Sequence, residues 1–316
     1  MGDLRWRAPG GGGLFEPSRR VVGRGAYRGL TFHEVEARSI LNRVNAPNLP
    51  FNWTINPYRG CSHACVYCFA RPTHEYLGLG IGEEFETEIV VKVNAVELTR
   101  AETAPGRWAG EPIAMGTNTD PYQAAEGKYR LTRGILEVLV ERSNPFSILT
   151  KSTLVLRDLG LIVEASRRAE VTVSFSIGTL DEQVWRETEP GTPHPRRRVE
   201  AISRLKEAGI RTGVLIAPII PGLSDRADQV AEVEKACRDA GADSIGKIRL
   251  HLRPGVKEHY MGWLREAHPE LVDRYEALYR NRAYLPRSRD GSRPVPRPAR
   301  KPAPAREVVQ PTLPFG

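Results

Sequence analysis

The stretch CSHACVYC, from Cys61 to Cys68, decides the fold of this chain. Its three cysteines follow the spacing CxxxCxxC and lie in a loop between residues 56–60 and 69–72. Three thiolates can bind three irons of a [4Fe–4S] cluster and leave the fourth iron open to a ligand from outside the protein. The spacing therefore predicts a cluster bound by Cys61, Cys65 and Cys68.

Two other uses of cysteine are weighed against a cluster. Zinc accepts three cysteines and one histidine, and His63 or His74 could be the fourth ligand. Structural zinc sites usually draw on two separated cysteine pairs, however, and no second pair is present. A disulfide framework is not expected for four cysteines in 316 residues without a secretory segment. Cys237 shares a helical face with Val233, so we expect it to be a small buried apolar residue.

The positive charge of the chain belongs to its two ends. Residues 1–50 hold eight Arg or Lys against four Asp or Glu, and residues 285–316 hold seven against two, while residues 51–284 are close to neutral. Basic ends attract phosphate backbones, but Arg- and Pro-rich tails are also often only solvated and disordered. We predict an N-terminal extension (1–50), a core domain (51–284) and a disordered basic tail (285–316). No apolar run is long enough for a membrane span, and we expect a cytoplasmic protein.

Short β-branched runs alternate with amphipathic helical patterns, which predicts an α/β fold. Strand–helix alternation at this spacing is typical of parallel strands in βα units. Six such units would form a partial (β/α)6 barrel. Gly209 and Gly241 directly follow two of the helices, as expected of glycine C-caps. The predicted strands are 51–57, 112–116, 146–150, 171–177, 211–217 and 244–252, and the predicted helices are 128–142, 154–168, 196–208 and 225–240.

Polar residues follow several of these strands. Residues 116–120 follow the second strand and Lys151 follows the third, while Ser174 and Ser176 alternate on the fourth and so face one side. In βα barrels ligands bind at the carboxyl ends of the strands. We therefore expect these polar residues at a binding site.

The cysteine spacing, with Tyr67 just before the third cysteine, resembles the signature of the radical S-adenosylmethionine (SAM) enzymes. Residues 150–151, 174–177, 189–192 and 217–219 also resemble matching segments of spore photoproduct lyase and its relatives in that family, in the same order. The resemblance implies an open barrel, a [4Fe–4S] cluster whose free iron takes SAM, and an electron donor such as flavodoxin or ferredoxin.

The same resemblance implies roles for individual residues. Lys151 and Ser176 would hold SAM, since an ammonium can neutralise its carboxylate and a hydroxyl can bond it. Tyr67 and Phe69 would border the adenine. Glu189 would belong to the site or only brace the helix that starts near Arg196. The implied cofactor contacts are Tyr67, Phe69, Asn118, Asp120, Lys151, Ser174 and Ser176.

Two residues depart from the pattern of the lyase. Thr117 stands where the lyase has a cysteine that returns a hydrogen atom to the repaired thymine, and a threonine O–H bond is too strong for easy hydrogen donation. Phe69 stands where the lyase has a tyrosine directly after its third cluster cysteine. We therefore predict that the chain keeps the radical machinery and acts on a different substrate.

The C-terminal end carries a further motif. Gln310, Leu313 and Phe315 resemble the Q-x-x-L-x-F peptides by which bacterial repair proteins dock on the sliding clamp. Such a peptide inserts its Leu and Phe into an apolar pocket, and a flexible linker would raise its effective concentration near DNA.

Together the patterns predict a radical SAM enzyme that abstracts hydrogen from a substrate, with nucleic acid in repair or base modification as the first expectation. The alternative of another class is a metal-holding protein that binds DNA or a partner without chemistry. Reductive cleavage of SAM would discriminate the two.

Overall fold

The computed structural model describes residues 17–45 and 49–285. Its larger sheet has the strand order β11-β10-β9-β8-β7-β4-β3. Neighbouring strands from β4 to β11 are parallel, and β3 (Leu41–Arg43) pairs antiparallel with β4. This arrangement confirms the predicted partial (β/α)6 barrel. The parallel strands are β4 (Trp53–Ile55), β7 (Ile113–Met115), β8 (Phe146–Thr150), β9 (Val171–Ser176), β10 (Arg211–Ile219) and β11 (Ser244–Arg249).

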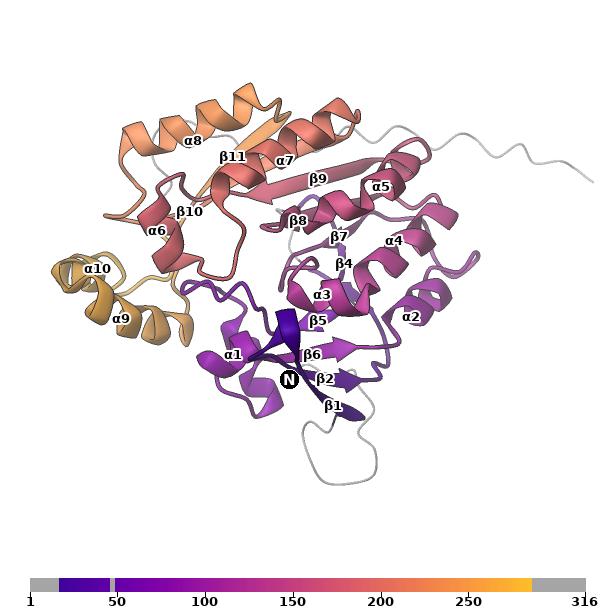
Figure 1. Ribbon diagram of the computed structural model, residues 1–316, viewed down its shortest axis with the longest axis horizontal. Helices are drawn as coiled ribbons and strands as arrows, with labels where there is room; N and C mark the ends of the chain where they lie inside the picture. The colour runs from indigo at the N-terminus through magenta and orange to yellow at the C-terminus, as the bar shows by residue number, and fades with distance from the viewer. Residues whose placement is uncertain (1–16, 46–48, 286–316) are drawn as a thin grey trace, which may run out of the picture.

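Helices cover one face of this sheet (Figure 1). Two α-helices begin later in the chain than their apolar patterns predict: α4 begins at Leu131 rather than at 128, and α5 begins at Leu159 rather than at 154. Arg130, at φ 53°, ends α3 before α4 begins, and Ser152 accepts a hydrogen bond from Leu154 N at the start of a 3-10 turn, η4, which precedes α5. Gly209 and Gly241 have φ values of 78° and 90°, as glycine C-caps require. The covering helices are α3 (Ala124–Tyr129), α4 (Leu131–Glu141), η4 (Thr153–Asp158), α5 (Leu159–Ser166), α7 (Pro195–Glu207) and α8 (Ala227–Asp239).

A second, four-stranded sheet lies at the N-terminal end of the described chain (Figure 1). Its order is β1 (Arg19–Val22), β2 (Thr31–Val35), β6 (Glu88–Lys92) and β5 (Tyr58–Arg59). Residues 1–50 therefore contribute strands to both sheets. The small sheet was not predicted, because β2 finds its parallel partner β6 more than fifty residues further along the chain and local patterns do not report such pairing.

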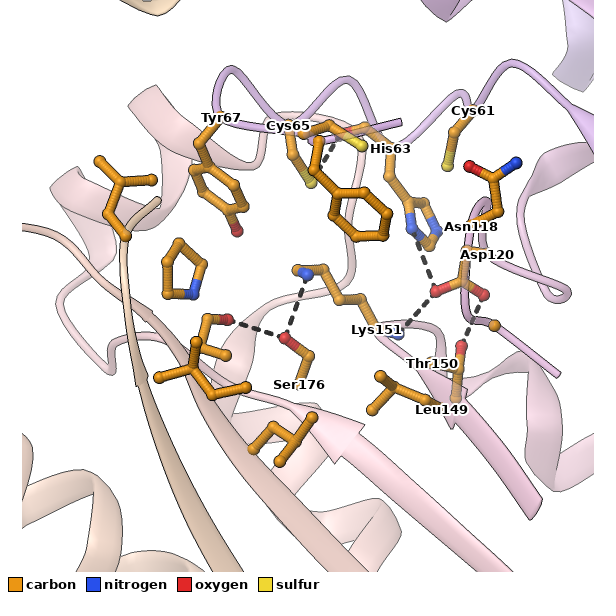
Figure 2. Close-up of a pocket in the computed structure, with 18 of the residues that line it drawn as sticks. Cys61, His63, Cys65, Tyr67, Asn118, Asp120, Leu149, Thr150, Lys151 and Ser176 are labelled. Atoms are coloured by element: carbon orange, nitrogen blue, oxygen red, sulfur yellow. Dashed lines mark hydrogen bonds and ion pairs between the residues drawn. The ribbon is translucent and has the colours of Figure 1, made fainter. Parts of the chain in front are cut away.

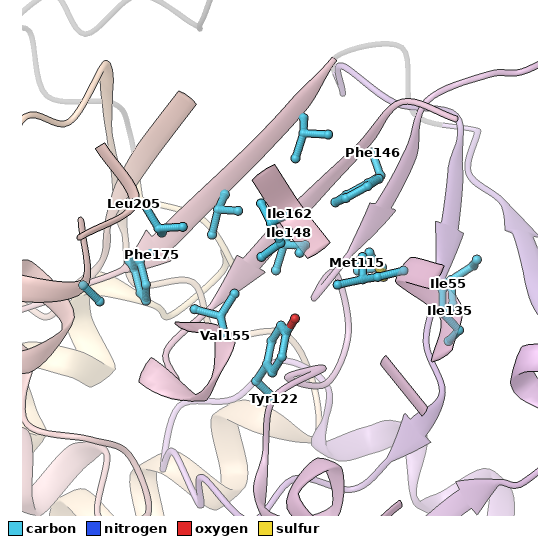
Figure 3. Packing of buried hydrophobic residues seen from close by; sticks show 14 of the residues in the cluster. Ile55, Met115, Tyr122, Ile135, Phe146, Ile148, Val155, Ile162, Phe175 and Leu205 are labelled. Carbon is cyan, nitrogen blue, oxygen red and sulfur yellow. The ribbon is translucent and has the colours of Figure 1, made fainter. Parts of the chain in front are cut away.

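The main core fills the space between the large sheet and its helices (Figure 3). Ile148 and Phe175 from the strands meet Ile162 and Leu205 from the helices, and all four are essentially inaccessible to solvent. Cys237 is buried in the same core, as predicted.

A separate cluster joins the cysteine loop to the last helices. Cys65, Val66 and Tyr67 pack with Tyr260 of α9 and Tyr275 of α10. The remaining elements are η1 (Gly25–Tyr27), η2 (Arg71–Thr73), η3 (Glu75–Leu77), α1 (Glu83–Thr87), α2 (Ala95–Glu102), α6 (Glu182–Thr188), α9 (Val256–Ala267), η5 (Pro269–Leu271) and α10 (Val272–Leu278).

The predicted tail, and with it Gln310, Leu313 and Phe315, lies outside the described residues. Among the residues that are described, no helix has the length and apolar character needed to span a bilayer.

Candidate functional site

A cavity of about 210 Å³ opens between the cysteine loop and the carboxyl ends of the parallel strands. Figure 2 shows the loop along one side of this cavity and strand residues along the other. Nine of the ten predicted site residues line it, and Ser174 is the exception. The nine are Cys61, Cys65, Tyr67, Cys68, Phe69, Asn118, Asp120, Lys151 and Ser176.

The cysteine loop is shaped by contacts to its main chain. Gln123 donates from Nε2 to the Gly60 carbonyl at 2.9 Å and accepts from the Ser62 N–H at 3.1 Å. The guanidinium of Arg71, fully buried, donates to the Cys65 carbonyl from Nε at 3.1 Å and from Nη2 at 2.9 Å. These bonds fix the loop without using any cysteine side chain.

The turn after α6, at residues 189–192, contacts the main chain of the cysteine loop directly. Gly191 N donates to the His63 carbonyl at 3.1 Å, and Val66 N donates to the Thr188 carbonyl at 3.1 Å. A Cβ added to Gly191 would lie 2.0 Å from the Ser62 carbonyl oxygen, so no larger residue fits there without movement. This close approach explains why the Glu-Pro-Gly-Thr segment has a glycine at position 191.

The three cysteines are free thiols. Burial raises the pKa of the Cys65 thiol to about 12 and raises the pKa values of Cys61 and Cys68 as well. The thiols are therefore protonated at neutral pH, and a bound metal would stabilise their thiolates.

The arrangement of donors can be compared with what a single metal ion and a cluster each require. Within residues 17–45 and 49–285, no three His, Cys, Asp or Glu side chains lie close enough to share one metal ion, as a Cys3His zinc site requires. His74, one candidate fourth ligand, contacts the Glu88 carbonyl through Nε2 at 3.0 Å and does not line the cavity. In a [4Fe–4S] cluster each cysteine binds its own iron. Three free thiols around one cavity fit that requirement.

Lys151 brings its ammonium group into the cavity (Figure 2). Its Nζ donates to Ser176 Oγ at 3.0 Å, and Ser176 Oγ donates in turn to the Ala217 carbonyl at 2.8 Å. Nζ also lies 5.7 Å from the centre of the Tyr67 ring. Burial acts to lower the pKa of Lys151, but Glu189 and the neighbouring Cys65 and Cys68 together leave that pKa above its usual value. Lys151 is thus a cation at neutral pH.

Asp120 joins three elements at the cavity wall (Figure 2). Its Oδ1 accepts from Thr150 Oγ1 at 2.7 Å, and its Oδ2 accepts from Lys151 N at 2.7 Å and lies 3.4 Å from His63 Nδ1. Burial lowers the pKa of His63, so this ring is neutral at pH 7. Asp120 therefore ties the second strand of the barrel to the third and to the cysteine loop.

Glu189 is a central charge beside the cavity rather than a remote one. Its Oε2 lies 2.6 Å from Nη2 of Arg198 on α7, its Oε1 lies 4.0 Å from Lys151 Nζ, and it accepts a hydrogen bond from the Tyr67 hydroxyl. Burial alone would raise the pKa of Glu189, yet the charges of Arg198 and Lys151 bring it below the usual value. The predicted brace to the α7 helix is present, and it also reaches the site.

The residues that line the cavity differ in part from the predicted site residues. Ser174 is not a cavity residue, because it lies two positions before Ser176 on β9, next to Gly213 of β10. Conversely, Ile248, Leu250 and His251 line the cavity and were not predicted. No motif marks them in the sequence, and only their place at the end of the last barrel strand could have suggested them.

The fold and site together define a parallel βα barrel with a three-cysteine loop across its ligand-binding end. The chain belongs to the Radical SAM superfamily, whose sequence model matches residues 55–233.

The chain is also similar to individual proteins. The chain is 47% identical over 270 residues to the uncharacterized protein Rv2578c of Mycobacterium tuberculosis, covering 85% of this chain and 79% of that protein. It is 25% identical over 169 residues to the Radical SAM Nα-GlyT isomerase of Pseudomonas phage M6, covering 53% of this chain and 33% of the isomerase.

Among solved structures, spore photoproduct lyase complexed with dinucleoside spore photoproduct shares the fold. The TM-score is 0.54 at 19% identity, covering 76% of this chain and 66% of the lyase chain. The chain thus spans slightly less than two thirds of the length of that enzyme.

Proposed function

We propose that this protein is a radical SAM enzyme in which Cys61, Cys65 and Cys68 hold a [4Fe–4S] cluster. The observation that carries the proposal is a single cavity lined by three free thiols and the ammonium of Lys151. With SAM bound, a reduced cluster would supply radical chemistry that abstracts hydrogen from a substrate. The chain's own contribution is to position the cofactors and to exclude water.

The cavity residues divide this work. Lys151 would neutralise the carboxylate of SAM, because its ammonium lines the cavity. Ser176 would offer its hydroxyl from the same position, and Asn118 would offer its amide. Tyr67 and Phe69 would provide apolar rings beside the adenine, on either side of Cys68.

For the substrate we propose nucleic acid, in repair or base modification. The basic ends of the chain support this class, since Lys and Arg neutralise phosphates. Thr117, in place of the hydrogen-donating cysteine, and Phe69, in place of a tyrosine, argue for a substrate other than spore photoproduct. A cluster that must be reduced also needs an electron donor, and flavodoxin or ferredoxin would fill that role in the cytoplasm.

The deciding experiment is anaerobic purification followed by three measurements: iron and sulfide content, and release of 5′-deoxyadenosine from SAM by the reduced protein. We expect about four irons per chain, as the cluster contains, and formation of 5′-deoxyadenosine. Bound zinc without 5′-deoxyadenosine would instead support a metal-holding protein that binds DNA or a partner without chemistry.

A Lys151→Met variant sharpens this test. It removes the ammonium but keeps an unbranched side chain in the wall, so the iron content should stay unchanged while SAM binding weakens. Equal SAM affinity in both proteins would contradict the role proposed for Lys151.

A further inference from the structure

An aromatic surface lies at the mouth of the cavity and is not used by the cofactor residues. His251 lines the cavity, and the ring of Tyr284 stacks on it with centroids 5.1 Å apart and an interplanar angle of 25°. Tyr284 is 52% exposed, so part of this residue is open to solvent. We call His251, Tyr284 and Arg253 the rim platform.

The platform is held by the fold rather than by chance proximity. His251 and Tyr284 form an antiparallel bridge, and Leu252 N donates to the Ala283 carbonyl at 2.8 Å. Arg253 donates from Nε to the Tyr284 hydroxyl at 2.6 Å, and its guanidinium lies 5.5 Å from the centre of that ring. The end of the described chain is thereby fixed at the cavity mouth.

The chemistry of the platform suits a flat aromatic ring beside a negative charge. Burial, together with the charge of Arg253, lowers the pKa of His251, so the imidazole is neutral at pH 7. Neutral aromatic rings stack on nucleobases regardless of sequence, and guanidinium groups add stacking and phosphate contacts. Phe69, which is assigned to the adenine, adjoins this surface without belonging to the rim platform: it is 46% exposed, and its ring centre lies 6.5 Å from that of His251.

The chain beyond the platform adds charge complementarity. Residues 286–316 begin two positions after Tyr284 and hold seven Arg or Lys against two Asp or Glu. A strongly basic segment of the sequence therefore follows the rim platform directly along the chain. Lys and Arg neutralise phosphates, so this charge complements a nucleic acid bound at the platform.

We propose that the rim platform is a stacking subsite for an unpaired base of single-stranded nucleic acid, next to the reacting nucleotide in the cavity. The inference deepens the proposed function and rests on it for the identity of the cavity. In a duplex the faces of the bases are covered by their neighbours, so the platform selects single strands or extruded bases.

The test measures binding of the full chain to fluorescently labelled oligonucleotides of about 12 nucleotides, as single-stranded DNA, single-stranded RNA and duplex DNA. Single strands should bind more tightly than the duplex. Tyr284→Ala should weaken single-strand binding by about tenfold, the loss expected for one stacked base, whereas Tyr284→Phe should stay within about twofold because it keeps the ring.

Tyr76→Ala is the matched control, since Tyr76 is 68% exposed and lies outside the cavity lining. It should bind like the unaltered chain. The proposed stacking role would be overturned if Tyr284→Ala bound single strands as tightly as the unaltered chain does. It would also be overturned if the unaltered chain bound duplex DNA more tightly than single strands.

A second arm separates the substrate's base from the adenine of SAM. SAM binding is measured by equilibrium dialysis for the same variants and should be unchanged by Tyr284→Ala. An equal loss for SAM and for the oligonucleotide would assign the platform to the cofactor and overturn the proposal.

Failure of this inference and failure of the proposed function are distinguishable. A chain that releases 5′-deoxyadenosine but does not bind single strands keeps the radical chemistry and loses the platform. A chain that binds single strands through Tyr284 without cleaving SAM keeps the platform and loses the chemistry.

Discussion

At the scale of single residues, the site depends on a charge pair that solvent does not reach. Arg198 is completely buried, and besides Glu189 it donates to the carbonyls of Ser176 and Pro193 at 3.0 and 2.9 Å. Removing one partner of a buried pair leaves the other charge uncompensated, which costs far more than the pair contributes when intact. Glu189 would then keep the Lys151 ammonium, 4.0 Å from its Oε1, as a nearby cation.

We therefore predict that Arg198→Met lowers the free energy of unfolding by about 3–5 kcal/mol. Arg196→Met is the control on the same helix, because Arg196 is exposed and lies 3.4 Å from Glu232 at the surface. Its cost should stay below about 1 kcal/mol. Urea unfolding of both variants provides the measurement, and similar costs for the two would show that Arg198 is not a buried brace.

The cysteines permit an equally direct comparison. Cys65→Ala removes one of the three proposed iron ligands and should abolish stable cluster binding. Cys237→Ala alters a buried cysteine in the main core and should retain the full iron content. The measurement is the iron and sulfide content of both variants after anaerobic reconstitution. A full iron content in Cys65→Ala would contradict the cluster assignment.

At the scale of elements, the turn at residues 189–192 couples α6 to the cysteine loop. Gly191→Ala should displace this turn, because its new Cβ would meet the Ser62 carbonyl oxygen at 2.0 Å. We expect a lower melting temperature and weaker iron retention, since the displaced turn also supports the loop backbone. Gly160→Ala in α5 is the control: its Cβ meets nothing within 4 Å, and alanine favours helices. A melting temperature for Gly191→Ala equal to that of the unaltered chain would contradict the coupling.

The sequence predicts the elements of the barrel better than those of the small sheet. Strands β8 and β9 are short runs in which buried apolar residues alternate with less buried ones, and the glycines after α7 and α8 mark where those helices end. Strand β2 pairs with β6, which only the tertiary fold brings near, although its other partner β1 is close in the sequence. The pairing of β2 with β6 cannot be read from local periodicity.

The cavity residues likewise include some that the sequence predicts and some that only the structure reveals. Cys65, Lys151 and Ser176 follow from motif and resemblance, and all three line the cavity. Ser174 was assigned from alternation along its strand, which fixes the facing direction but not the depth within the barrel. His251 and Tyr284 meet through a bridge between segments with no motif, so only the structure brings them together.

At the scale of the whole molecule, the basic tail carries a prediction of its own. We expect Gln310, Leu313 and Phe315, which lie outside the described residues, to dock on a bacterial sliding clamp. The full chain should bind immobilised clamp, and a Leu313→Ala/Phe315→Ala double variant should lose at least about 3 kcal/mol of binding free energy, because two buried apolar anchors are removed. Surface plasmon resonance measures this, and unchanged binding of the double variant would exclude the motif.

The hydrogen bonds that hold the main chain of the cysteine loop also bear on how the protein acquires its metal in the cell. They come from Arg71, Gln123 and Gly191. The groups that shape the loop belong to the rest of the chain, so we expect the loop to keep its form without metal. Zinc fingers, by contrast, are unfolded until metal binds. We expect the apoprotein and the loaded protein to have the same far-ultraviolet circular dichroism spectrum. Under iron starvation the newly made chain would then persist as a folded reserve, ready for loading when iron returns.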